Sequence, residues 1–149
     1  MSNLMYKLLF SYDNVGWETP SDLFEKINSV FNFDTDIYAN FDTTKCEKYF
    51  AQSDDALLED WVGTCWMNLP YGREVSKWVS KAYYESKKHS STIVCLLPAR
   101  VDTNWWHNFC ADAEYIFIKG RLKFTDSPNS APSPSAIVVF RPTLKDVQL

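Results

Sequence analysis

The stretch STIVCLLPA (residues 91–99) decides the fold class. It carries no charge, and an unbroken apolar run of this length is typical of a strand buried on both faces of a parallel sheet. A shorter run from Thr64 to Met67, ending at Asn68, predicts a second buried strand. Between the two runs, residues 73–88 carry one apolar helical stripe, made by Val75, Trp78, Val79, Ala82 and Tyr83.

The alternation of strands and helices continues beyond residue 99. A helix is expected from Thr103 to Ala111, a strand over YIFIKG (residues 115–120) and a last strand over AIVVF (residues 136–140). Because strands alternate with helices between residues 64 and 118, the sequence predicts an α/β fold. Its sheet should be mostly parallel, with helices on both faces.

The first third of the chain begins with a helix signal. Thr19 can cap free backbone N–H groups, and Pro20 suits the first helical position. The apolar spacing that follows predicts a helix over residues 20–31, and Phe33 to Ala39 is expected to form a short strand. Two further helical segments are expected, at Thr44 to Ala51 and Ala56 to Trp61.

The length and composition indicate one globular unit. A chain of 149 residues is expected to form a single domain, residues 1–149, around one core. Within it, TDSPNSAPSPS (residues 125–135) is rich in Ser and Pro and is predicted to be a flexible loop. No apolar run approaches the length of a membrane span, and no secretory signal pattern is seen, so no membrane partner is expected.

The spacing of the cysteines indicates a reducing environment. The four of them, at positions 46, 65, 95 and 110, form no C-x-x-C pair, and His89 and His107 do not stand at ligand spacing to them. This pattern is typical of reduced, buried thiols in a cytoplasmic protein. It does not predict a disulfide framework or a zinc site, and no metal is expected.

Charge is distributed unevenly along the chain. The net charge is −4, but residues 1–70 hold twelve acidic and four basic side chains, whereas residues 71–123 hold nine basic and five acidic ones. The second stretch can therefore supply a local basic face for a polyanion. A solvated helix face explains four of its lysines equally well, namely Lys77, Lys81, Lys87 and Lys88.

The stretch WMNLPYG (residues 66–72) stands where a ligand site is expected. Ligands of parallel α/β sheets bind at the carboxyl ends of the strands, and Asn68 ends a predicted strand. Asn68 offers an amide oxygen, and Pro70 restricts Leu69 so that its carbonyl has a fixed direction. Tyr71 adds a flat face beside these two oxygens.

This set of groups suits an amino group on an aromatic ring. Two acceptors that bind the amine hydrogens favour a pyramidal nitrogen with a free lone pair, while Tyr71 stacks on the ring. A ring that belongs to a duplex must first be flipped out of it. The alternative is an ordinary turn from strand to helix, for which Asn, Pro and Gly are common.

The tetrapeptide Asn68-Leu69-Pro70-Tyr71 resembles the catalytic motif of amino-methyltransferases, usually Asp or Asn followed by Pro-Pro and an aromatic residue. The wider chain, from about Trp17 to Phe140, resembles the phage-type DNA N-6-adenine methyltransferase (Dam) family. The segments that carry this resemblance, in order, are WETP (17–20), DIYA (36–39), NLPYG (68–72), LLPARVDTNWWH (96–107), FIKGRLKF (117–124) and SAPSPSAIVVF (130–140).

The resemblance implies a Rossmann-like, S-adenosylmethionine-dependent fold and transfer of a methyl group to N6 of a flipped-out adenine in DNA. The catalytic site would be formed by Asn68, Leu69, Pro70 and Tyr71. The cofactor would be bound by Trp17, Thr19, Pro20, Asp36 and Asp55.

Three of these residues have an expected partner on S-adenosylmethionine. Thr19, at a helix N-terminus, suits the methionine carboxylate, although it can equally be a plain helix cap. Asp36 would bind the methionine ammonium. Asp55 would contact the adenine part of the cofactor, or it is a surface acid that precedes a helix.

The resemblance also implies double-stranded DNA as the partner, in the cytoplasm of a host cell if the protein is encoded by a phage. Contacts with DNA are expected from Arg73, Arg100, Arg121 and Lys123, although Arg121 and Lys123 can also line a hairpin in solvent. The chain has no separate target-recognition domain, so a homodimer would add surface for reading DNA.

Two departures from the family pattern leave other functions open. Leu69 replaces the more usual proline, and no glycine-rich loop follows Asp36, where a close approach to the cofactor would favour glycine. A methyltransferase scaffold that binds without catalysis is therefore the main alternative. Methylation of RNA or of a protein amide is another.

Overall fold

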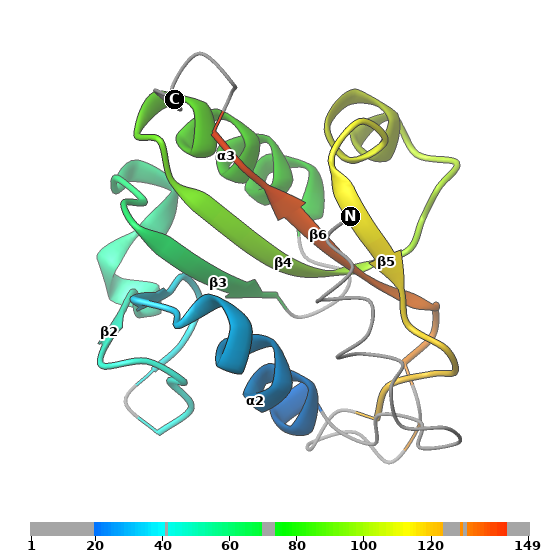
Figure 1. Cartoon of the computed structure of the whole chain (residues 1–149), viewed down its shortest axis with the longest axis horizontal. Helices are drawn as coiled ribbons and strands as arrows, with labels where there is room; N and C mark the ends of the chain where they lie inside the picture. The colour runs from blue at the N-terminus through cyan, green and yellow to red at the C-terminus, as the bar shows by residue number, and fades with distance from the viewer. Residues whose placement is uncertain (1–19, 41, 70–73, 124–128, 130, 143–149) are drawn as a thin grey trace.

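The computed structural model describes residues 20–40, 42–69, 74–123, 129 and 131–142 (Figure 1). Its centre is a six-stranded sheet in the order β2-β1-β3-β4-β6-β5. The strands are β1 (Thr35–Asp36), β2 (Lys48–Tyr49), β3 (Thr64–Asn68), β4 (Thr92–Pro98), β5 (Glu114–Phe117) and β6 (Ser135–Phe140). The helices are α2 (Pro20–Phe31) and α3 (Val75–Lys88), with 3-10 turns η1 (Gln52–Asp54) and η2 (Ala56–Leu58) and a π-helical turn η3 (Trp106–Cys110).

The direction of the strands confirms a mostly parallel sheet with one reversal. Strands β2, β1, β3 and β4 run parallel to one another. Strand β6 lies between β4 and β5 and is antiparallel to both. A strand in this position is flanked on both sides, and all six residues of β6 are buried, which explains its continuous apolar sequence.

Helices cover both faces of the sheet, as predicted. Strand β4 shows why both faces are apolar, because successive side chains of a strand point to opposite faces. Ile93 and Cys95 belong to the core beneath α3 and η3, whereas Val94 and Leu96 belong to the core beneath α2. This layered α/β arrangement is the Rossmann-like architecture expected of a methyltransferase.

The helix predicted over residues 20–31 is confirmed, and its end has a local cause. Asn32 adopts a left-handed conformation with φ 53°, which stops the helix. The side chain of Asn28 then accepts a hydrogen bond from the Phe33 backbone N–H at 2.8 Å. The chain is thereby turned from α2 into β1.

The helix predicted from Thr44 to Ala51 is wrong. This segment forms a turn and then β2, because its backbone is bound by β1: Asp36 accepts hydrogen bonds from the backbone N–H groups of Lys45 and Phe50. The Thr44 hydroxyl also accepts from the Cys46 N–H, a local bond that competes with helix formation. The helix predicted from Ala56 to Trp61 is reduced to the 3-10 turn η2.

The cysteines match the expectation of reduced thiols. All four are free, and Cys65, Cys95 and Cys110 are buried. Burial raises the pKa of the Cys65 and Cys110 thiols to about 12, so both stay protonated near neutral pH. Among the described residues, no helix is long and apolar enough to cross a bilayer.

Candidate active site

The order of the strands defines a topological switch point between β1 and β3. Strand β1 pairs with β2 on one side and with β3 on the other, so the order of the chain reverses between β1 and β3. In open α/β sheets, ligands bind at such a switch point, outside the carboxyl ends of the strands. Strand β1 ends at Asp36 and β3 ends at Asn68, so two predicted site residues flank the switch point.

The register brings these two residues onto one face of the sheet. Asp36 pairs with Trp66, and Asn68 lies two positions further along β3. Strand spacing then places the Cα atoms of Asp36 and Asn68 about 8 Å apart. Trp66 packs into the core beneath α2, and Asp36 and Asn68 share its face because side chains alternate.

Asn68 carries an unused acceptor. Its Oδ1 atom is buried and has no hydrogen-bond partner among the described residues. An unsatisfied buried acceptor costs about 1–3 kcal/mol, so such an atom needs an explanation. A bound amino group would supply the missing hydrogen.

Leu69 has a packing role that the sequence did not reveal. Its side chain is buried and lies in the core beneath α3 and η3. The departure from proline at this position is therefore accommodated by apolar packing, and the Leu69 backbone follows directly from the end of β3. Pro70 and Tyr71 lie outside the described residues.

Asp36 is a buried acid that is held by backbone donors. Its side chain accepts hydrogen bonds from the N–H groups of Tyr38 (3.3 Å) and Lys45 (3.0 Å). Burial raises the pKa of its carboxyl to about 6, and the two backbone bonds and the Lys45 charge partly oppose this rise. Asp36 thus organises the loop between β1 and β2 and is also poised to bind a cation.

The start of α2 lies beside the same loop. The Lys45 Nζ atom donates a hydrogen bond to the Ser21 hydroxyl at 2.8 Å, which joins the first turn of α2 to the segment held by Asp36. Pro20 is the first residue of α2, as predicted. A helix N-terminus favours an anionic group such as a carboxylate. Trp17 and Thr19 lie outside the described residues.

Asp55 differs from Asp36 and Asn68 in its exposure to solvent. It is exposed, lies between η1 and η2, and has a left-handed backbone with φ 48°. The side chain of its neighbour Asp54 accepts a hydrogen bond from Ala51, whereas that of Asp55 caps neither turn. A contact between Asp55 and the cofactor stays a prediction.

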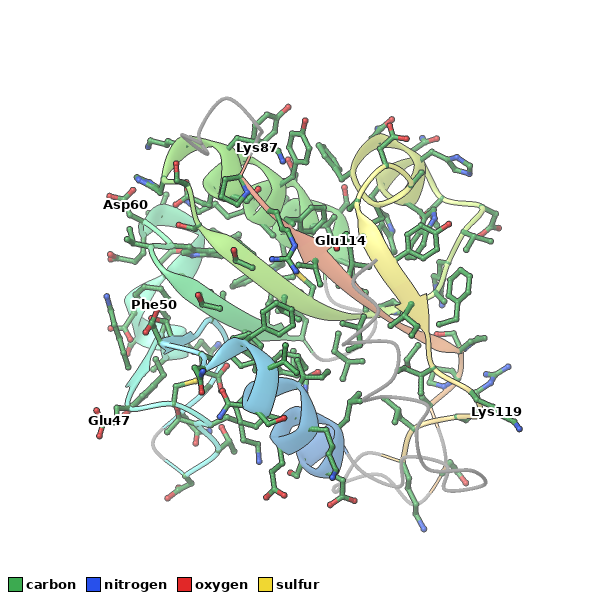
Figure 2. All side chains as sticks on the ribbon, in the orientation of Figure 1. Glu47, Phe50, Asp60, Lys87, Glu114 and Lys119 are labelled. Carbon is green, nitrogen blue, oxygen red and sulfur yellow. The ribbon has the colours of Figure 1, made fainter. Side chains whose placement is uncertain are left out.

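The predicted DNA contacts follow the carboxyl ends of β4 and β5. Arg100, Arg121 and Lys123 are exposed, and the Arg121 guanidinium donates to the Ala131 carbonyl at 3.4 Å. Lys119 was not predicted, but it is also exposed and extends away from the sheet (Figure 2). Arg73 lies outside the described residues.

The lysines of α3 have intramolecular partners. Lys77 pairs with Glu74, Lys81 pairs with Glu85, and Lys88 lies 3.9 Å from Asp60. Lys87 donates to the Arg141 carbonyl at 2.6 Å. These contacts favour the solvated helix face over a basic patch for DNA.

The six-stranded sheet with helices on both faces is consistent with the Rossmann-like fold of a methyltransferase. The family model of the DNA N-6-adenine-methyltransferase (Dam) matches residues 11–148, so the chain belongs to that family. It is therefore an adenine-specific DNA methyltransferase, and S-adenosylmethionine is the methyl donor of this class of enzyme.

Two curated relatives are similar to the chain. A "DNA N-6-adenine-methyltransferase" from Haemophilus phage HP1 (strain HP1c1) is 30% identical over 136 residues, which cover 85% of this chain and 78% of that protein. A protein named "Putative methyltransferase YfdM", from Escherichia coli (strain K12), is 35% identical over 63 residues, which cover 37% of this chain and 69% of that protein.

Proposed function

We propose that the switch point between the carboxyl ends of β1 and β3 brings S-adenosylmethionine and a flipped-out adenine together. The observation that carries this proposal is the buried Oδ1 atom of Asn68, which has no hydrogen-bond partner in the part of the chain that the structure describes. The N6 amino group of adenine is a donor that this acceptor lacks. The Leu69 carbonyl supplies the second acceptor, and Pro70 and Tyr71 complete the predicted motif.

The two acceptors would act on the reactivity of N6. In free adenine the N6 lone pair is delocalised into the ring, which makes the nitrogen a weak nucleophile. Hydrogen bonds from N6 to Asn68 and to the Leu69 carbonyl favour a pyramidal nitrogen. S-adenosylmethionine would supply the methyl group and retain the sulfur as the leaving thioether, while Asn68 and the Leu69 carbonyl would keep the N6 lone pair available for it until the surplus N6 proton passed to solvent.

Asp36 and the start of α2 would hold the methionine part of the cofactor. The ammonium group is the cation that the buried Asp36 carboxylate can bind without leaving its backbone donors. The carboxylate group suits the N-terminus of α2, and Trp17, Thr19 and Pro20 are the proposed contacts of this part of the cofactor. Asp55 is the proposed contact for the adenine part of the cofactor.

Double-stranded DNA would lie across the carboxyl edge of the sheet. Arg100, Arg121 and Lys123 are exposed at this edge, and we include Arg73 and Lys119 with them. These side chains would bind phosphates, which position the duplex without reading its sequence. The proposed place of action is the cytoplasm of a host cell, where the DNA is.

A second copy of the chain would enlarge this surface. Strand β5 is at the edge of the sheet and leaves Tyr115 and Phe117 exposed by 37% and 47%. Both rings contact Trp106, so they form a fixed aromatic surface. Sedimentation of the chain with and without DNA would test dimerisation, and a monomer under both conditions would contradict it.

Calorimetry with S-adenosylmethionine tests the proposed function. The wild-type chain should bind the cofactor, and Asp36→Asn should bind it at least tenfold more weakly. A folded wild-type chain that binds no cofactor would favour the alternative, a methyltransferase scaffold without catalysis. Parallel methyl-transfer assays on DNA, RNA and protein would separate the remaining alternative substrates.

A further inference from the structure

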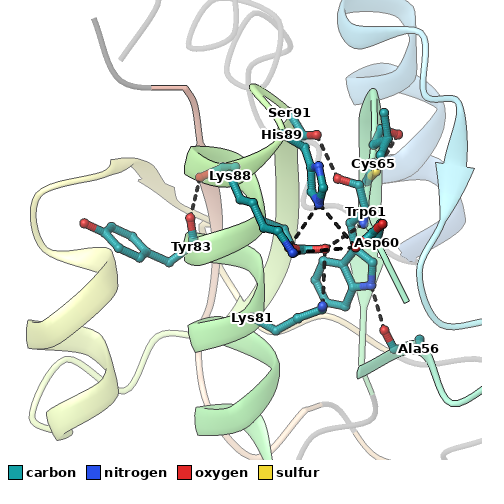
Figure 3. Close-up of polar contacts among 12 residues, drawn as sticks. Ala56, Asp60, Trp61, Cys65, Lys81, Tyr83, Lys88, His89 and Ser91 are labelled. Atoms are coloured by element: carbon teal, nitrogen blue, oxygen red, sulfur yellow. Dashed lines mark hydrogen bonds and ion pairs between the residues drawn. The ribbon is translucent and has the colours of Figure 1, made fainter. Parts of the chain in front are cut away.

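A cluster of metal-ligating side chains lies at the amino edge of the parallel strands, opposite the proposed active site. It consists of Asp60, which precedes β3, of Glu85 in the last turn of α3 and of His89, the residue that caps the end of α3. Figure 3 shows Asp60 and His89 pointing toward each other. Glu85 and His89 are four residues apart, so both side chains lie on one face of the helix. Asp60 approaches the same point from the segment that enters β3.

We propose that Asp60, Glu85 and His89 form a binding site for a divalent transition metal ion such as Zn²⁺. The Nε2 atom of His89 lies 3.3 Å from Asp60 Oδ1 and 3.6 Å from Glu85 Oε2, and one ligand atom from each residue lies within 4.8 Å of the others. Nitrogen and oxygen ligands of a tetrahedral zinc ion are about 3.4 Å apart, given metal–ligand bonds of about 2.1 Å.

The bonding of His89 also points to a missing ligand. Its Nε2 atom is buried and makes no hydrogen bond of good geometry among the described residues, although both carboxylates lie within ion-pair distance of it. Neutral imidazole offers a lone pair at this nitrogen, which is the commonest protein ligand for zinc. A metal ion held by Nε2 would satisfy that atom.

Glu85 is held so that one of its oxygens faces His89. The other oxygen, Oε1, accepts a hydrogen bond from the Trp61 backbone N–H at 2.8 Å and pairs with Lys81 Nζ at 3.2 Å. Oε2 is therefore the oxygen presented to the metal. Because Glu85 is only 3% exposed, its orientation is fixed by the surrounding core before any ion binds.

Two lysine side chains lower the affinity of this site for a metal ion. Lys81 already neutralises Glu85 through Oε1, and Lys88 Nζ lies 3.9 Å from the Asp60 oxygen that would bind the metal. Both Lys88 and Asp60 are about two-thirds exposed, with side-chain values of 67% and 64%, so their pair is weak and can be displaced. Removing Lys88 should strengthen metal binding.

The ion would have a structural role. It would join the end of α3 to the entrance of β3, the strand that ends at Asn68. A ligand that binds only the folded state stabilises it by an amount that grows with the logarithm of its concentration once this exceeds Kd. The site thus goes beyond the methyl transfer proposed for the opposite edge and does not depend on it.

Thermal unfolding of the full-length chain with added Zn²⁺, after treatment with a chelator, tests the proposal. The Tm should rise by several degrees and continue to rise with Zn²⁺ concentration. The increase should be lost in His89→Gln and in Asp60→Asn, whose exposed side chain leaves the fold intact. His107→Gln is the matched control, because it removes the chain's other histidine, and it should keep the full increase.

Cobalt provides a second readout. Co²⁺ at the site should show the weak visible absorption of nitrogen and oxygen ligands, and His89→Gln should lose it. Lys88→Gln should bind Zn²⁺ at least threefold more tightly, and an affinity that does not rise would contradict the competition described above. A Tm that does not change in Zn²⁺, or an equal increase in Tm in His89→Gln, would overturn the metal site. The cluster would then be a set of ion pairs only.

Discussion

Two buried acids at opposite edges of the sheet differ in their partners. Asp36 and Glu85 are each 3% exposed. Glu85, at the amino edge, has a close side-chain cation in Lys81 and a backbone donor in Trp61. Asp36, at the carboxyl edge, is held chiefly by the backbone donors of Tyr38 and Lys45.

The two buried acids therefore have different electrostatic environments. A buried charge that is paired in the folded chain stabilises the arrangement around it. The Asp36 carboxyl has a raised pKa because the effect of burial exceeds that of its backbone donors and of the Lys45 charge, so it should gain from binding a cation supplied by a ligand. The Oδ1 atom of Asn68, which has no partner among the described residues, lies at the same carboxyl edge, so the cofactor and the adenine should bind there.

The largest expected effect is on the carboxyl edge, in Asn68→Ala. Loss of the acceptor for N6 should lower kcat by about 10²–10³-fold, the usual effect of removing one electrostatic stabiliser of the transition state. S-adenosylmethionine binding and Tm should stay near wild type. Steady-state methylation of DNA measures the effect, and unchanged kcat in the folded variant would contradict the proposed role.

The next largest effect is the loss of stability expected of Glu85→Gln at the amino edge. This change leaves Lys81 without its partner and should lower the free energy of unfolding by roughly 3 kcal/mol. Glu74→Gln is the matched control, because it breaks an exposed pair with Lys77 and should cost less than about 1 kcal/mol. Denaturant unfolding compares the two variants, and equal losses would contradict a structural role for Glu85.

The stability of the folded chain should depend on pH through Asp36 at the carboxyl edge. The pKa of Asp36 is about 6 in the folded chain, compared with 3.8 for an ordinary Asp side chain. Between these two pH values the folded state therefore keeps a proton on Asp36 that the unfolded state has lost. This group's contribution to stability therefore falls as pH rises from about 4 to 6. The methionine ammonium should bind the deprotonated form.

Affinity for S-adenosylmethionine should accordingly fall as pH decreases through about 6, approaching tenfold per pH unit. Calorimetry between about pH 5 and about pH 8 measures this slope, because this range brackets the pKa of Asp36. Asp36→Asn should bind weakly with little pH dependence. A wild-type affinity that does not change over this range would contradict the pairing of Asp36 with the ammonium.

The smallest expected effect is on DNA binding. Arg100→Ala and Arg121→Ala should each reduce the slope of log K against log salt by about 1, with a uniform loss of affinity across sequences. Arg141→Ala is the matched control, because Arg141 pairs with Glu114 at the amino edge. Fluorescence titrations at several salt concentrations compare them, and an equal change in Arg141→Ala would contradict the proposed DNA surface.

The strongly periodic part of the fold could be predicted from the sequence. The apolar runs of β3 and β4 and the stripe of α3 are local patterns, and the structure confirms them. The segment from Thr44 to Ala51 could not be predicted, because Asp36 fixes its backbone through contacts that are distant in sequence. The antiparallel direction of β6 depends likewise on its place between two other strands.

The candidate site was predictable from the residues only at Asn68, which was placed correctly at the carboxyl end of its strand. Asp36 lies inside the strand predicted from Phe33 to Ala39, and in the structure it ends the shorter β1. The link from Lys45 to Ser21 was missed, since it joins residues that share no local pattern. The cluster of Asp60, Glu85 and His89 was missed for the same reason, because Asp60 meets the end of α3 only in the folded chain.

The most direct test of the account is the content of N6-methyladenine in DNA from cells that express the chain. Mass analysis of digested DNA should find this base with the wild-type chain and a loss of about 10²-fold or more with Asn68→Ala at equal protein level. The account predicts that Glu74→Gln gives the wild-type amount. Equal methylation by the wild type and Asn68→Ala, or none by a folded, cofactor-bound wild type, would contradict methyl transfer at the carboxyl edge.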